Sequence, residues 1–182
     1  MAHQFSTSYI EDSLSLFRYY KKLGEGAIEQ VSDEQLFASL DREMNSIAII
    51  VKHIAGNMRS RWTDFLTSDG EKPDRNRDTE FEHPPSTRGE VLKLWSEGWD
   101  RVFSALEPLS DSDCQRTVSI RGEPHSVMQA INRQIAHYSY HVGQIVYLAR
   151  HLAWPEWKSL SIPRGKSADV KGSFKSGVGF LR

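Results

Sequence analysis

The segment from Ser126 to Ala153 constrains the fold most, because its apolar residues recur in a strict four-three alternation. This spacing keeps apolar side chains on one face of a long helix and is typical of the contact line between helices in a bundle. The line is formed by Ile131, Ile135, Tyr138, Val142, Ile145, Ala149 and Leu152. A long amphipathic helix needs neighbours that cover its apolar face, so the segment predicts a helical bundle.

Three further segments show helical spacing of apolar residues, over about 8–23, 45–66 and 88–106. We expect the first to end at Gly24 and Gly26, and Pro108 to stop the third. Alternating β-branched residues around Arg121 predict a small hairpin near 117–124. The sequence therefore predicts an all-α fold: a four-helix bundle with a minor β-hairpin, in a single domain over residues 1–182.

Composition excludes several classes of function. The 182 residues include 23 basic and 24 acidic side chains, a balance that indicates neither a nucleic acid nor a membrane surface as partner. The longest apolar runs, such as residues 47–51, are too short to span a bilayer. The N-terminal residues lack the apolar core of a signal peptide, and the lone Cys114 fits a reducing compartment. We therefore expect a cytoplasmic protein.

Three histidines are the candidate functional residues. His137 and His141 are four positions apart in the last predicted helix, so their imidazoles project from the same side. His53 lies in the second predicted helix. One histidine from a facing helix can complete a three-histidine metal site that keeps positions open for water or substrate. The pair alone is weak support, because histidines four residues apart often occur by chance.

A polar line on the second helix runs from His53 through Asn57 and Arg61 to Asp64. It is either a solvent-exposed flank or the wall of a polar cleft. An exposed flank would be rich in Lys and Glu, whereas these side chains suit metal ligation and hydrogen bonding, which favours the cleft. We expect Asn57 and Arg61 to bind substrate. The alternatives are that Arg61 forms a salt bridge with Asp64 or with an acidic residue at a helix end, and that Asn57 bonds across the bundle.

Two segments lack clear periodicity: the connection 69–86 and an irregular tail over 158–182. Connections of that length in compact domains are often functional. The tail contains Arg164 in a Pro-Gly context, "LSIPRGKS". We expect both segments to cover one mouth of the metal cleft, where Arg164 would help to bind an anionic substrate. The alternative is a tail fixed only by packing at the distant end of the bundle.

The histidine pattern resembles that of the DinB-like (YfiT-like) metalloprotein superfamily, over nearly the whole chain. The segments that carry the resemblance are "KHIAGNMRSRWTDFLTSDGEKPDRNRDTEF", "HYSYHVGQIVYLAR" and "WKSLSIPRGKS". The resemblance implies an up-down-down-up bundle and a divalent ion, often zinc or nickel, held by His53, His137 and His141. Some members of the superfamily transfer the thiol of a small cofactor such as bacillithiol, mycothiol or glutathione.

Three functions stay open at this point. The first is a metal-dependent enzyme acting on a small molecule, by transfer of a small thiol or by hydrolysis. The second is a non-catalytic metal-binding or stress-associated protein, and the third is a metal-free helical interaction module. A homodimer is expected from the resemblance and from surplus aromatic residues, notably Trp154, Trp157 and the tyrosines of the first helix.

Overall fold

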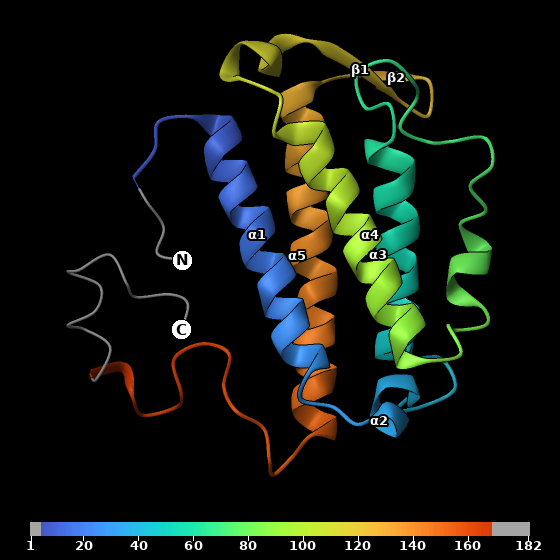
Figure 1. Cartoon of the computed structure of the whole chain (residues 1–182), viewed down its shortest axis with the longest axis vertical. Coiled ribbons are helices and arrows are strands. Elements are labelled where there is room, and N and C mark those ends of the chain that lie inside the picture. Colours follow the sequence, from blue (N-terminus) through green and yellow to red (C-terminus); the bar gives the residue numbers. More distant parts are fainter. Residues whose placement is uncertain (1–4, 169–182) are drawn as a thin grey trace.

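The computed structural model describes residues 5–168 and is mostly helical (Figure 1). The long helices are α1 (Tyr9–Ile28), α3 (Ile47–Trp62), α4 (Arg88–Leu106) and α5 (Val127–Leu152). The shorter elements are α2 (Asp33–Phe37), the 3-10 turns η1 (Asp78–Phe81) and η2 (Asp111–Gln115), and the strands β1 (Thr117–Ile120) and β2 (Glu123–Ser126). The predicted helical fold with a minor hairpin is confirmed.

Hydroxyl side chains begin each long helix. Ser8, Ser46, Thr87 and Ser126 each accept a hydrogen bond from the backbone N–H three residues further on. Such a cap satisfies one of the free N–H groups in the first turn and contributes about 1 kcal/mol. The start of each long helix is therefore determined by the residue directly before it.

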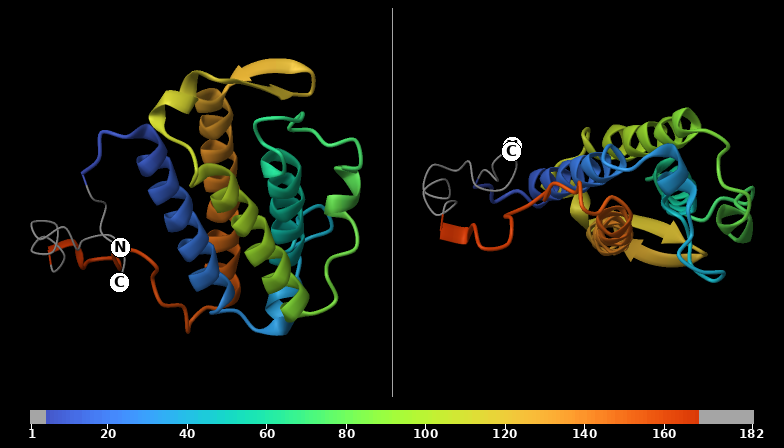
Figure 2. Two further views of the ribbon diagram at one scale, coloured as in Figure 1. Left: turned by 45° about the horizontal axis from the view of Figure 1, so that its top comes forward. Right: turned by 90° about the horizontal axis from the view of Figure 1, so that it is seen from below.

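The long helices pack in two neighbouring pairs, α1 with α5 and α3 with α4 (Figures 1 and 2). α3 also contacts α5, which brings the helix that carries His53 to the helix that carries the histidine pair. The connection after α3 runs back along the outer side of α3, so α4 starts at the same end as α3 (Figure 1). Phe17, Trp99 and Tyr138 are fully buried between the helices.

Asp69 ties the hairpin to the end of α3. Its carboxylate accepts hydrogen bonds from the Ser119 hydroxyl and from the backbone N–H groups of Arg121 and Gly122. The Ser119 hydroxyl and these N–H groups hold the pKa of Asp69 well below its ordinary value. Arg121 and Gly122 form the turn with φ of 57° and 75°, in the left-handed region. The hairpin thereby closes the end of the molecule at which α5 begins (Figure 1).

Two predicted helix ends are wrong. α1 continues through Gly24 to Ile28 because its apolar face continues there: Ala27 and Ile28 are fully buried. Gly24 is not a terminator but a close contact, since an added Cβ would lie 2.5 Å from carbons of the Trp95 indole. α3 ends at Trp62, before the predicted Leu66, and Asp64 beyond it has a φ of 50°.

The segment after α5 lies beside α1. The Gln30 side chain donates to the Lys158 carbonyl and accepts from the Lys158 N–H, and Leu160 packs over Gly26. Residues 169–182 of the predicted tail lie outside the described residues. Within residues 5–168, the structure contains no helix with the length and apolar character that crossing a bilayer requires.

Two glycine substitutions test this packing. Gly24→Ala should lower the melting temperature, because the new methyl group collides with the rigid, buried Trp95 ring. Gly143→Ala on α5 is the matched control, since a Cβ there meets nothing within 4 Å. It should raise stability by about 0.5–1 kcal/mol through helix propensity alone. Thermal unfolding followed by circular dichroism measures both; a stabilised Gly24→Ala variant would contradict the close contact.

Candidate metal centre

The structure brings His53, His137 and His141 together. His53 lies on α3 and the other two on α5, and one ring nitrogen from each lies within 4.8 Å of the others. The Nε2 atoms of His53 and His137 are 3.3 Å apart. In the described part of the chain, no cysteine or carboxylate joins this group. The three histidines could therefore hold a metal ion through imidazole nitrogens alone.

The separation of these nitrogens fits a shared ion. Bonds of about 2.0–2.1 Å at a tetrahedral angle place two ligand nitrogens about 3.3–3.4 Å apart. His53 and His137 have this spacing already. Three imidazoles would leave at least one position for a water molecule or a substrate atom.

Two hydrogen bonds orient the rings. His53 Nδ1 lies 2.8 Å from Glu80 Oε2, and His141 Nδ1 lies 2.8 Å from Gln144 Oε1. An ionised carboxylate and an amide oxygen only accept, so both Nδ1 atoms donate and both Nε2 atoms keep their lone pairs. His137 Nδ1 is buried and has no partner within the described residues. The free Nε2 atoms are the ones that a metal would use.

The histidines on α5 are neutral at physiological pH. Burial, with smaller contributions from His141 and His53, lowers the pKa of His137 to about 3. Burial, together with the nearby His53 and Arg77, likewise lowers the pKa of His141 to about 4, although the hydrogen bond that His141 donates to Gln144 opposes the shift. Protons therefore do not compete with a metal for these nitrogens near pH 7.

Glu80 is a buried carboxylate between His53 and Arg75. Its side chain is 8% exposed, and Arg75 donates to it through Nε (2.8 Å) and Nη2 (3.0 Å). Burial opposes ionisation of Glu80, but the hydrogen bonds from His53 and Arg75 outweigh it and lower the pKa. Glu80 is thus an anion whose charge Arg75 balances.

The pair Glu80–Arg75 belongs to a larger charged network. Arg75 also donates to Glu71, whose carboxylate accepts from Arg61 on α3 and from Arg121 in the hairpin turn. Burial opposes ionisation of Glu71, and the hydrogen bonds from Arg61 and Arg121 more than offset it, so its pKa is lowered. The network fixes the connection after α3 against both α3 and the hairpin.

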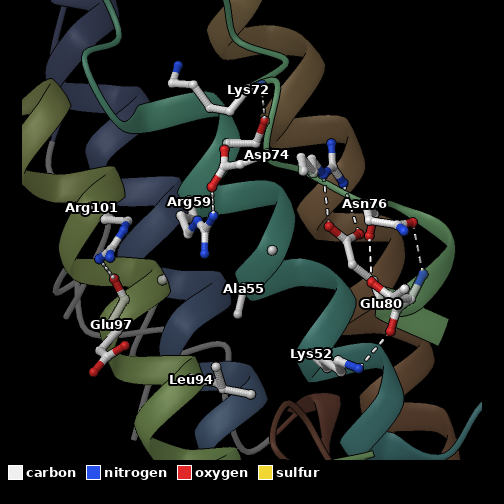
Figure 3. Close-up of a pocket in the computed structure, with 15 residues that line it drawn as sticks. Lys52, Ala55, Arg59, Lys72, Asp74, Asn76, Glu80, Leu94, Glu97 and Arg101 are labelled. Carbon is white, nitrogen blue, oxygen red and sulfur yellow. Dashed lines mark hydrogen bonds and ion pairs between the residues drawn. The ribbon is translucent and has the colours of Figure 1, made fainter. Parts of the chain in front are cut away.

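A hollow of about 290 Å³ lies on the other side of Glu80, between α3, α4 and residues 72–80 (Figure 3). Ala55 and Leu94 form its apolar part, and Arg59, Asp74 and Arg101 stand around it (Figure 3). The three histidines do not line this hollow. Glu80 contacts both the hollow and His53, so it separates the two.

Aromatic rings border the histidines. Phe81 stacks on the His53 ring with a centroid separation of 4.5 Å. The Arg77 guanidinium lies 5.2 Å from the centre of the Phe81 ring. Tyr140, 63% exposed, packs edge-on against His141. Phe81, in the 69–86 connection, therefore covers one face of His53.

The predicted substrate-binding residues are engaged elsewhere. The Asn57 amide oxygen accepts from the Tyr138 hydroxyl, which in turn accepts from the Trp62 indole. Arg61 is buried and donates to the Gly70 carbonyl and the Glu71 carboxylate. Asn57 and Arg61 thus make the contacts across the fold that were the alternatives, although the carbonyl and Glu71 replace Asp64 as partners of Arg61.

Arg164 belongs to the segment that follows α5. The segment after α5 lies beside α1, on the opposite side from η1 in both views (Figures 1 and 2). Gln30 and Lys158 exchange hydrogen bonds that hold the start of this segment at the end of α1. That Arg164 and the tail cover a mouth of the metal cleft stays a prediction.

Sequence reasoning missed Glu80, Arg75 and Phe81. All three lie in the connection without periodicity, where no regular spacing indicates which side chains point inward. The sequence sign that existed was an ionisable run, "RNRDTEFEH", too charged to predict a buried carboxylate.

Comparisons with known proteins agree with this description. The sequence model of a family described as "Protein of unknown function (DUF1572)" matches residues 4–166. The crystal structure of a DinB-like protein from Bacillus cereus is similar in fold, with a TM-score of 0.54 and 14% sequence identity. The similarity covers 81% of this chain and 94% of the B. cereus chain. No curated protein matches the chain significantly.

Glu80→Gln tests the support of the centre. The amide can still accept from His53 Nδ1, but without a negative charge, and Arg75 keeps only Glu71 as an anionic partner. Loss of such support typically weakens metal affinity by about 10- to 100-fold. Competition with a zinc chelator measures the affinity. Asp74→Asn, which alters the exposed partner of Arg59 in the same connection, should change nothing. Equal zinc affinity in the two variants would contradict this role of Glu80.

Proposed function

The chain belongs to the DUF1572 family, a DinB-like family, and we propose that it is a divalent-metal-binding protein and a metal-dependent enzyme that acts on a small molecule. The observation that carries the proposal is the convergence of the His53, His137 and His141 nitrogens within 4.8 Å. The hydrogen bonds from two of the rings to Glu80 and Gln144 support it, since they direct Nε2 to a common point.

The reaction class proposed is transfer of a small thiol or hydrolysis. A divalent ion supplies Lewis acidity that lowers the pKa of a bound water or thiol. The three histidines would hold it, and Glu80 would keep the proton of His53 on Nδ1. Phe81 shields one face of the His53 ring from water. The arrangement leaves the side near His137 and His141, which are only partly buried, for a small molecule to approach.

Zinc or nickel is the proposed ion, because imidazole nitrogens suit both. We also propose the up-down-down-up order of DinB-like bundles for the four long helices, and a cytoplasmic location for the protein. Similarity in fold to the B. cereus protein supports the helix order. Fold alone does not determine a reaction, so the enzymatic part depends on the site.

A non-catalytic metal-binding protein is the second candidate. One observation favours it: Glu80, the carboxylate that contacts the histidines, is paired with Arg75, so it is not a free general base. Assays of the zinc- and nickel-loaded protein with small thiols and electrophiles separate the two candidates, because only an enzyme gives turnover that the metal-free protein lacks.

A homodimer formed through α5 is proposed as well. Tyr140, Tyr147 and Trp154 follow one another at intervals of seven and are 63%, 70% and 75% exposed. Of the aromatic residues expected at the interface, Trp157 and Tyr20 instead pack partly against the core. Sedimentation at micromolar concentration should give twice the 20.8 kDa mass of one chain, and Tyr147→Glu should shift the protein to the monomer. A monomeric unmodified protein would contradict the dimer.

Metal content tests the proposal itself. His137→Ala should remove most bound zinc or nickel, because it deletes the ligand whose Nε2 lies 3.3 Å from Nε2 of His53. His151→Ala, an exposed histidine on the same helix, is the matched control and should keep the full content. Elemental analysis of purified protein gives the stoichiometry. Equal metal in both variants would defeat the assignment, and a folded wild type that takes up no metal would favour the helical interaction module.

A further inference from the structure

The centre would carry an unbalanced positive charge. Imidazole binds a metal ion in its neutral form, so the three candidate ligands would bring no negative charge to the ion, and Arg75 balances the charge of Glu80. Among residues 5–168, Glu80 is the carboxylate that contacts these histidines. A divalent ion with neutral ligands in a partly buried place favours an anionic partner, because a low dielectric strengthens the attraction.

Arg77 lies at the edge of this centre. Its guanidinium sits 5.2 Å from the Phe81 ring, and Phe81 stacks on His53. The contact with Phe81 orients the cation without neutralising it. In the described part of the chain, no carboxylate lies within ion-pair distance of Arg77. Arg77 is therefore an oriented, exposed cation that contacts the aromatic ring stacked on His53.

The neighbouring arginines are already engaged. Arg75 and Arg61 are buried and hold Glu80 and Glu71. Arg59 forms an exposed pair with Asp74 beside the hollow of Figure 3, on the other side of Glu80 from His53. α3 and the connection after it carry four arginines near the network. Among these four, only the Arg77 guanidinium has no carboxylate partner within the described residues and can bind the oxyanion of a ligand.

We propose that Arg77 is a substrate-binding residue and that the small molecule of this centre carries a carboxylate at its end distant from the metal-binding group. This inference rests on the proposed function. A planar carboxylate matches the two parallel N–H groups of a guanidinium, which adds both affinity and orientation. The metal would take one end of the molecule and Arg77 the other, so the mouth selects anionic over neutral molecules of the same length.

Two thiols of equal length test the proposal. In zinc-loaded protein, 3-mercaptopropionate offers a thiol and a carboxylate, and 3-mercaptopropan-1-ol offers the same thiol with a neutral end. Calorimetric titration measures both affinities, after elemental analysis has shown equal zinc in every variant. Arg77→Ala should weaken 3-mercaptopropionate by about tenfold or more, the range for a hydrogen bond to a charged group, and change the neutral thiol by less than about twofold. Arg59→Ala is the control and should change neither.

The outcomes separate the two levels of inference. A protein that binds no zinc overturns the proposed function, and the role of Arg77 with it. A zinc protein in which Arg77→Ala leaves 3-mercaptopropionate unchanged, weakens both thiols equally, or binds neither thiol in its wild-type form overturns the role of Arg77 alone. Partial rescue by Arg77→Lys, with the charge kept but the fork lost, supports the proposal.

Discussion

The buried pair of Glu80 and Arg75 is the interaction on which the candidate centre depends. It holds η1 against α3, and η1 in turn presents Glu80 to His53 and Phe81 to the face of the same ring. Removing one partner of such a pair typically lowers the free energy of unfolding by about 3–5 kcal/mol, because a charge is left buried without a partner. Gly56 on α3 makes the arrangement possible, since any side chain there would collide with the Glu80 carboxylate.

The same network links the centre to the hairpin. Glu71 joins Arg75 to Arg61 and Arg121, and Asp69 binds the turn at Gly122. The spacing of the helices that carry the histidines is held independently by the hydrogen bonds that run from Trp62 to Tyr138 and on to Asn57. Two sets of contacts therefore position the candidate centre. The Trp62–Tyr138–Asn57 hydrogen bonds fix the distance between α3 and α5, and the charged network fixes η1 against His53.

The sequence predicted what local spacing encodes. The four-three alternation indicated α5, and the interval between His137 and His141 placed both rings on one side. What it could not give depends on tertiary contacts. α1 passes through Gly24 because its buried face continues to Ala27 and Ile28. Glu80 is buried because Arg75 and His53 bind it, although the charged run "RNRDTEFEH" suggests a surface position.

The most direct measurement is a crystal structure of the zinc-loaded protein with anomalous scattering recorded at the zinc absorption edge. We expect one strong anomalous peak about 2.0–2.1 Å from Nε2 of His53, His137 and His141, with Glu80 still accepting the hydrogen bond from His53 Nδ1. A peak at another site, or histidines that contact one another directly in crystals grown with excess zinc, would contradict it.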